Sequence, residues 1–410
     1  MKDTKFGKDF ILVVIGQIIS LFGNAILCFA LPLYLLRQTN SPSLFGIVTA
    51  CAFLPMIVLS FLGGVLADRV NKRNIMVALD FFTAAVVTFL LLTLDKIPLV
   101  PLMMVILMVL YGISGSYRPA VQASIPALVS EENILSAGAI VNQVNALAGL
   151  LGPIIGGMLL AAFGITPILI ISILCFLTSA IMEIFIHIPY EKRENSLGMF
   201  AIIKSDFQDS TRYMRGEKPI LIKIIGLVCL FNLVLSAMIN VGTPILIVET
   251  LGLGDELLGL SQGFLAFGGL CGGMFTAVFS HKLKLANAHL LLLLCSLCAG
   301  AIALPLLLNA SPMTSFVVLT AACFGIMFLA TVFSVQMIAT VQRETPLELV
   351  GKVIALMMSA AMCAQPLGSG LYGIIFDRFA GFSGVILLCV GAVSALIALA
   401  TKKLFANMAN

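Results

Sequence analysis

Three ionisable side chains stand inside long apolar stretches of the sequence, where a charge is costly. They are Asp80, Arg118 and Glu183. A carboxyl group in such a place can bind and release a proton, or a nearby guanidinium can neutralise it. Asp80 and Arg118 are therefore candidates for an ion pair, and Asp80 alone is a candidate proton carrier. Glu183 either acts in the same way or is a structural residue that extends toward a polar surface.

Carboxamide side chains form a second group of polar residues within the apolar stretches. An amide offers a donor and an acceptor without a charge, so it can bind a neutral ligand or hold two helices together. Both roles stay open for each residue alone. As a set, and with 19 Met and 28 Phe to line the walls, they favour a cavity for bulky, largely apolar compounds. The candidates for this cavity are Gln17, Asn24, Asn142, Asn145, Asn232, Asn240, Gln336 and Gln365.

Other kinds of chemistry have little support in the sequence. The three His residues are scattered, and Cys295 and Cys298 have no second cysteine pair, so we expect neither a metal site nor a cofactor. The glycine-rich stretches lack the Lys-Ser/Thr of a nucleotide-binding loop, and no nucleophile stands beside a base. We therefore do not expect an enzyme. The net charge of +4 is too small to favour nucleic-acid binding.

Membrane-spanning helices must position these polar residues. Of the 410 residues, 60% are hydrophobic and 10% are charged, whereas soluble proteins carry about 25% charged residues. At this length only a helix satisfies its own backbone hydrogen bonds in lipid. The sequence predicts an all-α membrane protein with twelve transmembrane helices, near residues 10–36, 43–66, 75–94, 98–122, 134–163, 166–187, 219–249, 256–280, 287–309, 312–340, 346–375 and 381–402. Ser41, Thr166, Ser311 and Thr345 each precede a proline and are expected N-caps.

The positive charges predict the orientation of these helices. Cytoplasmic segments of membrane proteins are enriched in Lys and Arg. If the N-terminus lies inside, all of the 23 Lys and Arg residues except Arg37, Lys96 and Arg378 fall on the inner side. We therefore expect both termini to be cytoplasmic.

One long polar segment, Pro189 to Lys218, divides the twelve spans into six and six. This predicts a six-helix bundle over residues 1–188, a cytoplasmic linker over 189–218 and a second bundle over 219–410. The linker is either an ordinary solvated connection or, from Phe200 to Tyr213, an amphipathic helix on the membrane face. The halves also resemble each other at an offset of about 213 residues, where Glu131, Gly138 and Pro153 fall on Glu344, Gly351 and Pro366. A tandem duplication into two pseudo-symmetric bundles is expected.

Residues 64–76, which follow the second span, resemble the loop signature of the major facilitator superfamily. The matching residues include Gly64, Asp68, Arg69 and Arg73. Asn71 replaces the second glycine of the signature. Because asparagine also tolerates a left-handed backbone, we expect the turn to survive. A carboxylate among cations at the membrane surface forms a charge cluster. Such a cluster can be intact in one conformation of a gate and broken in the other.

The fifth span resembles a second motif of this superfamily, the antiporter motif. Its residues are Gly149, Gly152, Pro153, Gly156 and Gly157. In the superfamily this motif accompanies export. The alternative is helix packing alone, because small residues let a neighbouring helix approach closely and a proline bends the span. The two motifs together imply the major facilitator fold for the whole chain.

The resemblance narrows to the bacterial macrolide-efflux and enterobactin-exporter-like branch. Asp80 after the loop signature, Pro126, and Glu131 with Glu132 after the fourth span carry this narrower likeness. That branch often has an Arg three residues after the Asp, where this chain has Thr83. Any ion pair of Asp80 must then be made with another partner.

The resemblance implies a secondary-active exporter of amphipathic small molecules of the drug or macrolide type, working by alternating access. It also implies coupling to a proton or another ion, for which Asp80, Arg118 and Glu183 are the candidates. The expected partners are the substrate, the coupling ion and membrane lipid, with a monomer in the bacterial cytoplasmic (inner) membrane. The alternatives are an exporter or flippase of a siderophore or lysolipid and, from another class, a membrane sensor or scaffold without transport.

Overall fold

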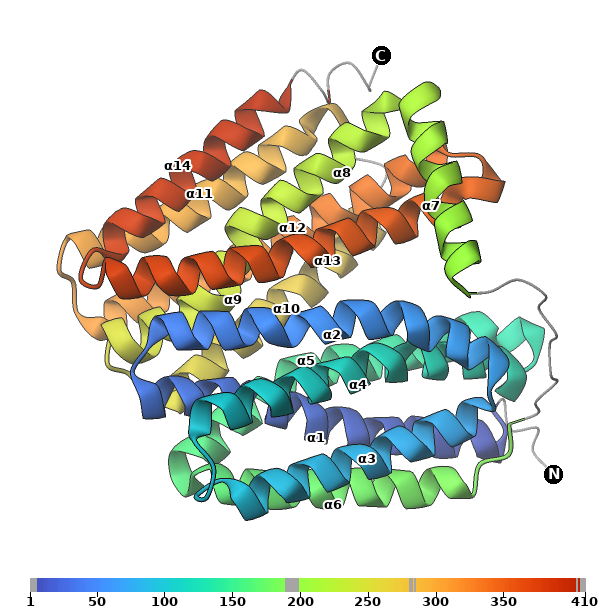
Figure 1. Cartoon of the computed structure of the whole chain (residues 1–410). Helices are drawn as coiled ribbons and strands as arrows, with labels where there is room; N and C mark the ends of the chain where they lie inside the picture. Colours follow the sequence, from blue (N-terminus) through green and yellow to red (C-terminus); the bar gives the residue numbers. More distant parts are fainter. Residues whose placement is uncertain (1–5, 189–198, 280–282, 284, 403–404, 406–410) are drawn as a thin grey trace. The chain divides into compact units, whose positions relative to one another are not determined.

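Figure 1 shows the computed structural model of the chain, which describes residues 6–188, 199–279, 283, 285–402 and 405. Of the side chains in these ranges, those of residues 61, 64–69, 135, 199–206, 286, 347 and 348 are not described. The described residues form helices and their connections, without a strand. Twelve helical segments in the described part of the chain are long and apolar enough to cross a membrane. The all-α architecture with twelve spans is therefore confirmed.

The structure divides into two compact units. Unit 1 comprises Met1–Asn40 and Val48–Ser196, and unit 2 comprises Ser41–Ile47 and Leu197–Asn410. The first six spans are α1 (Lys8–Thr39), α2 (Pro42–Arg69), α3 (Lys72–Thr93), α4 (Leu99–Leu128), α5 (Ile134–Phe163) and α6 (Ile165–Ile184), with a short 3-10 turn, η1 (Glu131–Asn133), before α5.

The first helix that lies wholly in unit 2 is α7 (Met199–Gly216), so the polar segment between the halves does contain a helix. The remaining spans run from Pro219–Thr250 to Ser383–Ala400. They are the segmented helix α8 (Pro219–Phe231), η2 (Asn232–Ser236), α9 (Ala237–Pro244) and η3 (Ile245–Thr250), and then α10 (Asp255–Phe279), α11 (Ala288–Leu307) with η5 (Leu285–Asn287) before it, α12 (Pro312–Glu344), α13 (Leu347–Arg378) and α14 (Ser383–Ala400).

The helix boundaries repeat along the chain. The helices that begin at Pro42, Leu99 and Ile134 have counterparts that begin at Asp255, Pro312 and Leu347, each 213 residues further on. A common spacing at three helix starts means that the two halves follow the same plan of spans and connections. This agrees with a six-span unit duplicated in tandem.

Two hydroxyl N-caps form as the sequence predicts. Ser41 Oγ accepts a hydrogen bond from the Leu44 backbone N–H at 3.3 Å, and Ser311 Oγ accepts one from Thr314 at 3.2 Å. The prediction for Thr345 is wrong. Its Oγ1 atom has no hydrogen-bond partner among the described residues, because α13 begins two residues later, at Leu347.

The prediction for Thr166 is also wrong, because Gly164 ends α5 and begins the next helix. Gly164 is the one residue between Phe163 and Ile165, with φ +75°. Residues with a side chain rarely adopt this conformation, so glycine is the residue that permits so abrupt a turn. Thr166 then lies inside the first turn of α6.

The seventh span departs from a regular α-helix at two places. The segments Asn232–Ser236 and Ile245–Thr250 are π-helical. A π segment widens the helix by one residue per turn and changes the direction of the side chains next to it, and such segments are frequent at functional sites. Asn232, a candidate from the sequence, is the first residue of η2.

Candidate functional site

Two carboxyl groups are buried together in unit 1. The Asp80 side chain on α3 is 2% exposed, and Glu183 at the end of α6 is 0% exposed. Ser20 on α1 donates a hydrogen bond to Asp80 Oδ1 at 3.0 Å, and Tyr117 on α4 donates one to Glu183 Oε1 at 2.7 Å. Four helices therefore contribute to one polar cluster.

The same cluster contains polar atoms without a hydrogen-bond partner. Among the described residues nothing bonds to Asp80 Oδ2, Glu183 Oε2 or Gln17 Nε2. Gln17 is 2% exposed and neighbours Tyr117 across α1 and α4. Buried polar groups are normally paired, so unpaired ones concentrated in one place mark a site with capacity for a further ligand.

Close packing of α6 on α1 holds this cluster in place. Ser179 Oγ donates to the Gly16 carbonyl at 3.1 Å, and Ser172 Oγ donates to the Gly23 carbonyl at 3.3 Å. A Cβ atom on Gly23 would lie 2.9 Å from Cys175 Cβ, so this crossing requires glycine. The small residues bring the helix backbones together and thereby fix the positions of Ser20 and Glu183.

A small cavity of about 30 Å³ opens beside Asp80. Ser20, Asn24, Tyr117 and Arg118 are among the side chains that line it. A water molecule needs roughly 10–15 Å³ of such space and two or more polar partners. The cavity therefore has room and polar contacts for water next to a buried carboxyl group.

The expected ion pair of Asp80 with Arg118 is not formed among the described residues. Arg118 is exposed, and Asp80 accepts its hydrogen bond from Ser20 instead. The two residues meet only as separate walls of the small cavity. The prediction failed because it considered two consecutive helices, α3 and α4, whereas Asp80 is bonded to α1.

The loop motif lies partly outside the described residues. The backbone of α2 continues through Gly64 and Asp68 to Arg69, but the side chains of these residues are not described. Asn71 is the N-cap of α3 and accepts a hydrogen bond from the Arg73 N–H at 3.0 Å, with φ −59°. A side-chain cap therefore starts α3 at this turn, and Asn71 does not use the left-handed backbone that asparagine tolerates.

The glycine motif of α5 lies against α1. A Cβ atom on Gly152 would overlap Ala25, and one on Gly156 would lie 3.1 Å from Phe29 Cδ1 and 3.3 Å from the Ile26 carbonyl oxygen. Gly149 has open space at the same position. Pro153 lies inside α5, and Gly157 is buried. Gly152 and Gly156 thus support close helix packing.

Unit 2 contains a cavity of about 330 Å³ around the first π segment. Asn232 and Asn240 both line it, together with apolar side chains such as Phe231, Met327 and Phe333. The Nδ2 atom of each amide donates to the carbonyl four residues earlier, at 3.0 Å in both cases. These bonds orient the side chains and leave each amide oxygen available as an acceptor.

The other predicted amides are placed differently. Gln17 and Asn24 belong to the polar cluster of unit 1. Asn142 is exposed, and Asn145 Nδ2 donates to the Val141 carbonyl at 2.8 Å. Gln336 and Gln365 are half-buried, with Gln336 Oε1 unpaired among the described residues. The last four, Asn142, Asn145, Gln336 and Gln365, do not line the cavity around Asn232.

Sequence reasoning missed the hydroxyl groups of the unit 1 cluster. Ser179 lies four residues before Glu183, a spacing that places both on one face of a helix. Gln17 and Ser20 are related in the same way by three residues. These spacings could have been read from the sequence, but serine is common in apolar helices and so draws little attention. Tyr117 has no comparable spacing to another polar residue of the cluster.

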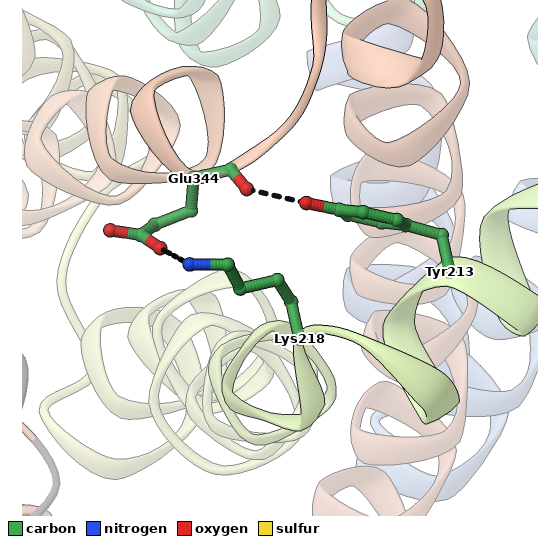
Figure 2. A network of polar contacts seen from close by, with 3 residues as sticks. All are labelled: Tyr213, Lys218 and Glu344. Carbon is green, nitrogen blue, oxygen red and sulfur yellow. Dashed lines mark hydrogen bonds and ion pairs between the residues drawn. The ribbon is translucent and has the colours of Figure 1, made fainter.

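A second polar network, outside the spans, was also missed. Glu344 is the last residue of α12, and its backbone carbonyl accepts a hydrogen bond from the Tyr213 hydroxyl at 2.8 Å (Figure 2). Its side chain pairs with Lys218, and this hydrogen bond and the negative charge raise the pKa of Lys218. Lys352 Nζ also lies 3.0 Å from Asp209 Oδ2. These contacts attach α7 to the ends of α12 and α13.

Twelve helices of spanning length among the described residues, arranged in two repeated halves, define a multi-pass membrane protein. The chain belongs to the Major Facilitator Superfamily, whose family model matches residues 13–369. The transporter class, and with it the absence of an enzyme function, is therefore confirmed.

Known proteins resemble the chain over nearly its whole length. It is 26% identical to macrolide efflux protein A of Streptococcus pyogenes over 393 residues, which cover 93% of this chain and 94% of the relative. It is 25% identical to the enterobactin exporter EntS of Shigella boydii serotype 4 over 402 residues, which cover 94% and 90%.

Solved structures share the fold. A D-xylose–proton symporter matches with a TM-score of 0.71 and 15% identity, covering 95% of this chain and 96% of the symporter. A bacterial homologue of the iron transporter ferroportin, in an inward-facing state, matches with a TM-score of 0.73 and 15% identity, covering 96% and 98%. At this level of identity the likeness establishes the fold alone.

Proposed function

We propose that the protein exports bulky amphipathic small molecules of the macrolide or drug type. The cavity around Asn232 and Asn240 supports this function most directly. Its volume of about 330 Å³ falls within the range of roughly 300–1,000 Å³ for ligand sites. Apolar walls with a few oriented amides suit a ligand that is mostly hydrophobic and carries scattered hydrogen-bonding groups. The relatives named for macrolide efflux and enterobactin export favour the outward direction.

Transport proceeds in this proposal by alternating access of two duplicated halves, driven by a proton gradient. The protein acts as a monomer in the bacterial cytoplasmic membrane, with both termini inside. The Lys and Arg distribution supports that orientation. The glycine-rich contact of α5 with α1 supports the view that unit 1 stays rigidly packed while the transporter changes between its two access states.

A siderophore or lysolipid is the second candidate substrate. Unit 2 also has an apolar groove of about 650 Å³ along α13 and α14, lined among others by Tyr372, Phe379 and Val393. An acyl chain would fit such a wall better than a compound with many polar groups. This groove favours a lipid-like substrate if the amide cavity proves unimportant.

The test uses everted vesicles and a panel of macrolides, a catecholate siderophore and a lysolipid, energised by a pH gradient or by membrane potential alone. Energised accumulation of a macrolide is expected, and Asn232→Ala and Asn240→Ala should raise its KM severalfold. Gln208→Ala is the matched control, because Gln208 is an exposed amide on α7. Accumulation of the lysolipid alone, unaffected by both Asn variants, would overturn the proposal.

A further inference from the structure

The polar cluster of unit 1 contains two acids, and among the described residues neither of them forms an ion pair with a basic side chain. An ionised side chain at the centre of a membrane helix costs about 2.5–3.5 kcal/mol. Two carboxylates in one site also repel each other, so one of them retains its proton. Asp80 and Glu183 lie close enough for the charge of one to act on the other.

The hydrogen bonds leave room for a proton on either acid. Ser20 and Tyr117 each donate to one oxygen of a carboxyl group, and the second oxygen, Asp80 Oδ2 or Glu183 Oε2, stays unpaired. The unpaired oxygens can be protonated without loss of an existing bond. The unpaired Gln17 amide nitrogen stands beside Tyr117 as a further donor when both acids are ionised.

The fold itself does not require these acids. By the repeat spacing of 213 residues Tyr117 corresponds to Ala330. α11 and α14 occupy the places of α3 and α6 in the second half and contain no acidic residue. The same six-span plan is therefore built in unit 2 from apolar residues. A structural need would apply to both halves, so the acids of unit 1 serve another purpose.

The cavity beside Asp80 could hold water that accepts a proton from the pair. It has room for water, and both Asp80 and Arg118 line it. A guanidinium that lines the same cavity as Asp80 without pairing with it supplies positive charge to the doubly ionised state, and it does not fix Asp80 as a permanent carboxylate. The exposure of Arg118 is consistent with such a role, because an arginine buried as a fixed partner would be ion-paired.

We propose that Asp80 and Glu183 together hold one exchangeable proton, and that this is the proton exchanged for substrate. The inference rests on the proposed exporter function. In the loaded state the pair carries one proton and one negative charge. On release, one carboxyl O–H bond breaks, the proton passes to water in the cavity beside Arg118, and both acids are ionised. The proton belongs to the pair and is not assigned to either acid.

Among the described residues, few titratable or charged groups lie near the pair. On α4, Tyr117 and Arg118 are the titratable or charged groups that face it, and on α1 the Cys28 thiol lies near Arg118. Gln17, Ser20 and Ser179 are polar but uncharged. Loss of one proton between the two states is thus the main change of charge in the cluster.

The first experiment measures protonation without substrate. The infrared C=O stretch of protonated carboxyl groups is titrated with pH in the purified protein. The wild type should lose a band as the pH rises, and the Asp80→Asn/Glu183→Gln double variant should lack it. Glu132→Gln, which changes an exposed acid of η1, should keep it. A band that persists in the double variant would overturn the inference, whatever the protein transports.

The second experiment measures coupling in proteoliposomes with the membrane potential collapsed and a neutral fluorescent macrolide as probe. One proton exchanged per substrate supports about tenfold accumulation for one pH unit. The wild type should approach this value. Asp80→Asn and Glu183→Gln should keep substrate counterflow but show no accumulation, whereas Thr88→Ala, which removes a hydrogen bond to the Ala84 carbonyl within α3 and away from the cluster, should accumulate normally.

The outcomes separate the two proposals. No accumulation or counterflow in the wild type would refute the exporter function. Wild-type accumulation that both acid variants retain would refute the proton site and leave the exporter function standing. Accumulation that follows a sodium gradient in place of a pH gradient would overturn the site as a proton carrier.

Discussion

Lys218 and Glu344 form an ion pair, with Nζ 2.6 Å from Oε2 (Figure 2). Lys218 directly precedes α8, and Glu344 ends α12. Together with the Tyr213 hydrogen bond to the same residue, the pair joins the polar helix α7 to two spans of unit 2. α7 is therefore positioned by unit 2, although the sequence presents it as part of a connection.

The two contacts to Glu344 should differ in their effect. Tyr213 is buried, so Tyr213→Phe should lower the free energy of unfolding of unit 2 by about 1 kcal/mol, the net value of a hydrogen bond. Lys218→Met should change it less, because exposed ion pairs contribute little. Thermal unfolding and amide hydrogen exchange of α7 measure both. Arg212→Ala, an exposed residue on the same helix, is the control, and equal effects of all three would contradict this view.

The Lys218 contact should depend on pH only in the alkaline range. The hydrogen bond and charge of Glu344 raise the pKa of Lys218 above the ordinary 10.5. A raised folded-state pKa means that the contribution is complete below 10.5 and is lost as the pH rises through the folded value. Hydrogen exchange in α7 should accelerate there, and Glu344→Gln should remove the transition. An unchanged transition in that variant would assign it to another group.

The glycines of α5 should separate packing from ligand binding. Gly152→Leu and Gly156→Leu each place atoms against α1 and should destabilise unit 1 by about 1–3 kcal/mol. Gly149→Leu is the matched control, because its added atoms enter open space. Thermal unfolding in detergent gives the comparison. Stable Gly156→Leu protein with an altered substrate preference would indicate a cavity-lining role.

The loop carboxylate Asp68 should be needed for turnover and not for folding. A charge cluster that stabilises one gate position by about 1.4 kcal/mol shifts the ratio of the two positions tenfold. Asp68→Asn should therefore be extracted in normal yield and transport roughly tenfold more slowly. Asp95→Asn, an exposed acid in another connection, is the control. Wild-type efflux by Asp68→Asn would exclude the gate role.

The number and approximate limits of the spans followed from the sequence because the bilayer imposes length and composition on each helix, although α4 runs to Leu128, six residues past its predicted end. The prediction at Ser311 held, since a hydroxyl before a proline at the first position depends on neighbouring residues alone. Thr345 has the same local pattern, yet α13 starts after it. Short-range rules thus fail where packing at the end of a long helix determines its first turn.

The candidate site was recovered only in part. Asp80, Glu183 and Gln17 stood out as polar residues in apolar runs, but their partners depend on how α1 crosses α6, which no local pattern encodes. The pairing with Arg118 was inferred from adjacency along the chain and is absent from the described structure. The π segment that begins at Asn232 has no sequence signal comparable to proline or glycine.

Gly164 has a consequence for the synthesis of the protein. A connection of one residue between Phe163 and Ile165 leaves no free length for α5 to settle across the bilayer before α6 emerges from the ribosome. We therefore expect the two helices to enter the membrane together as a hairpin, with α5 reaching its final position only after the chain has been made as far as Ile184.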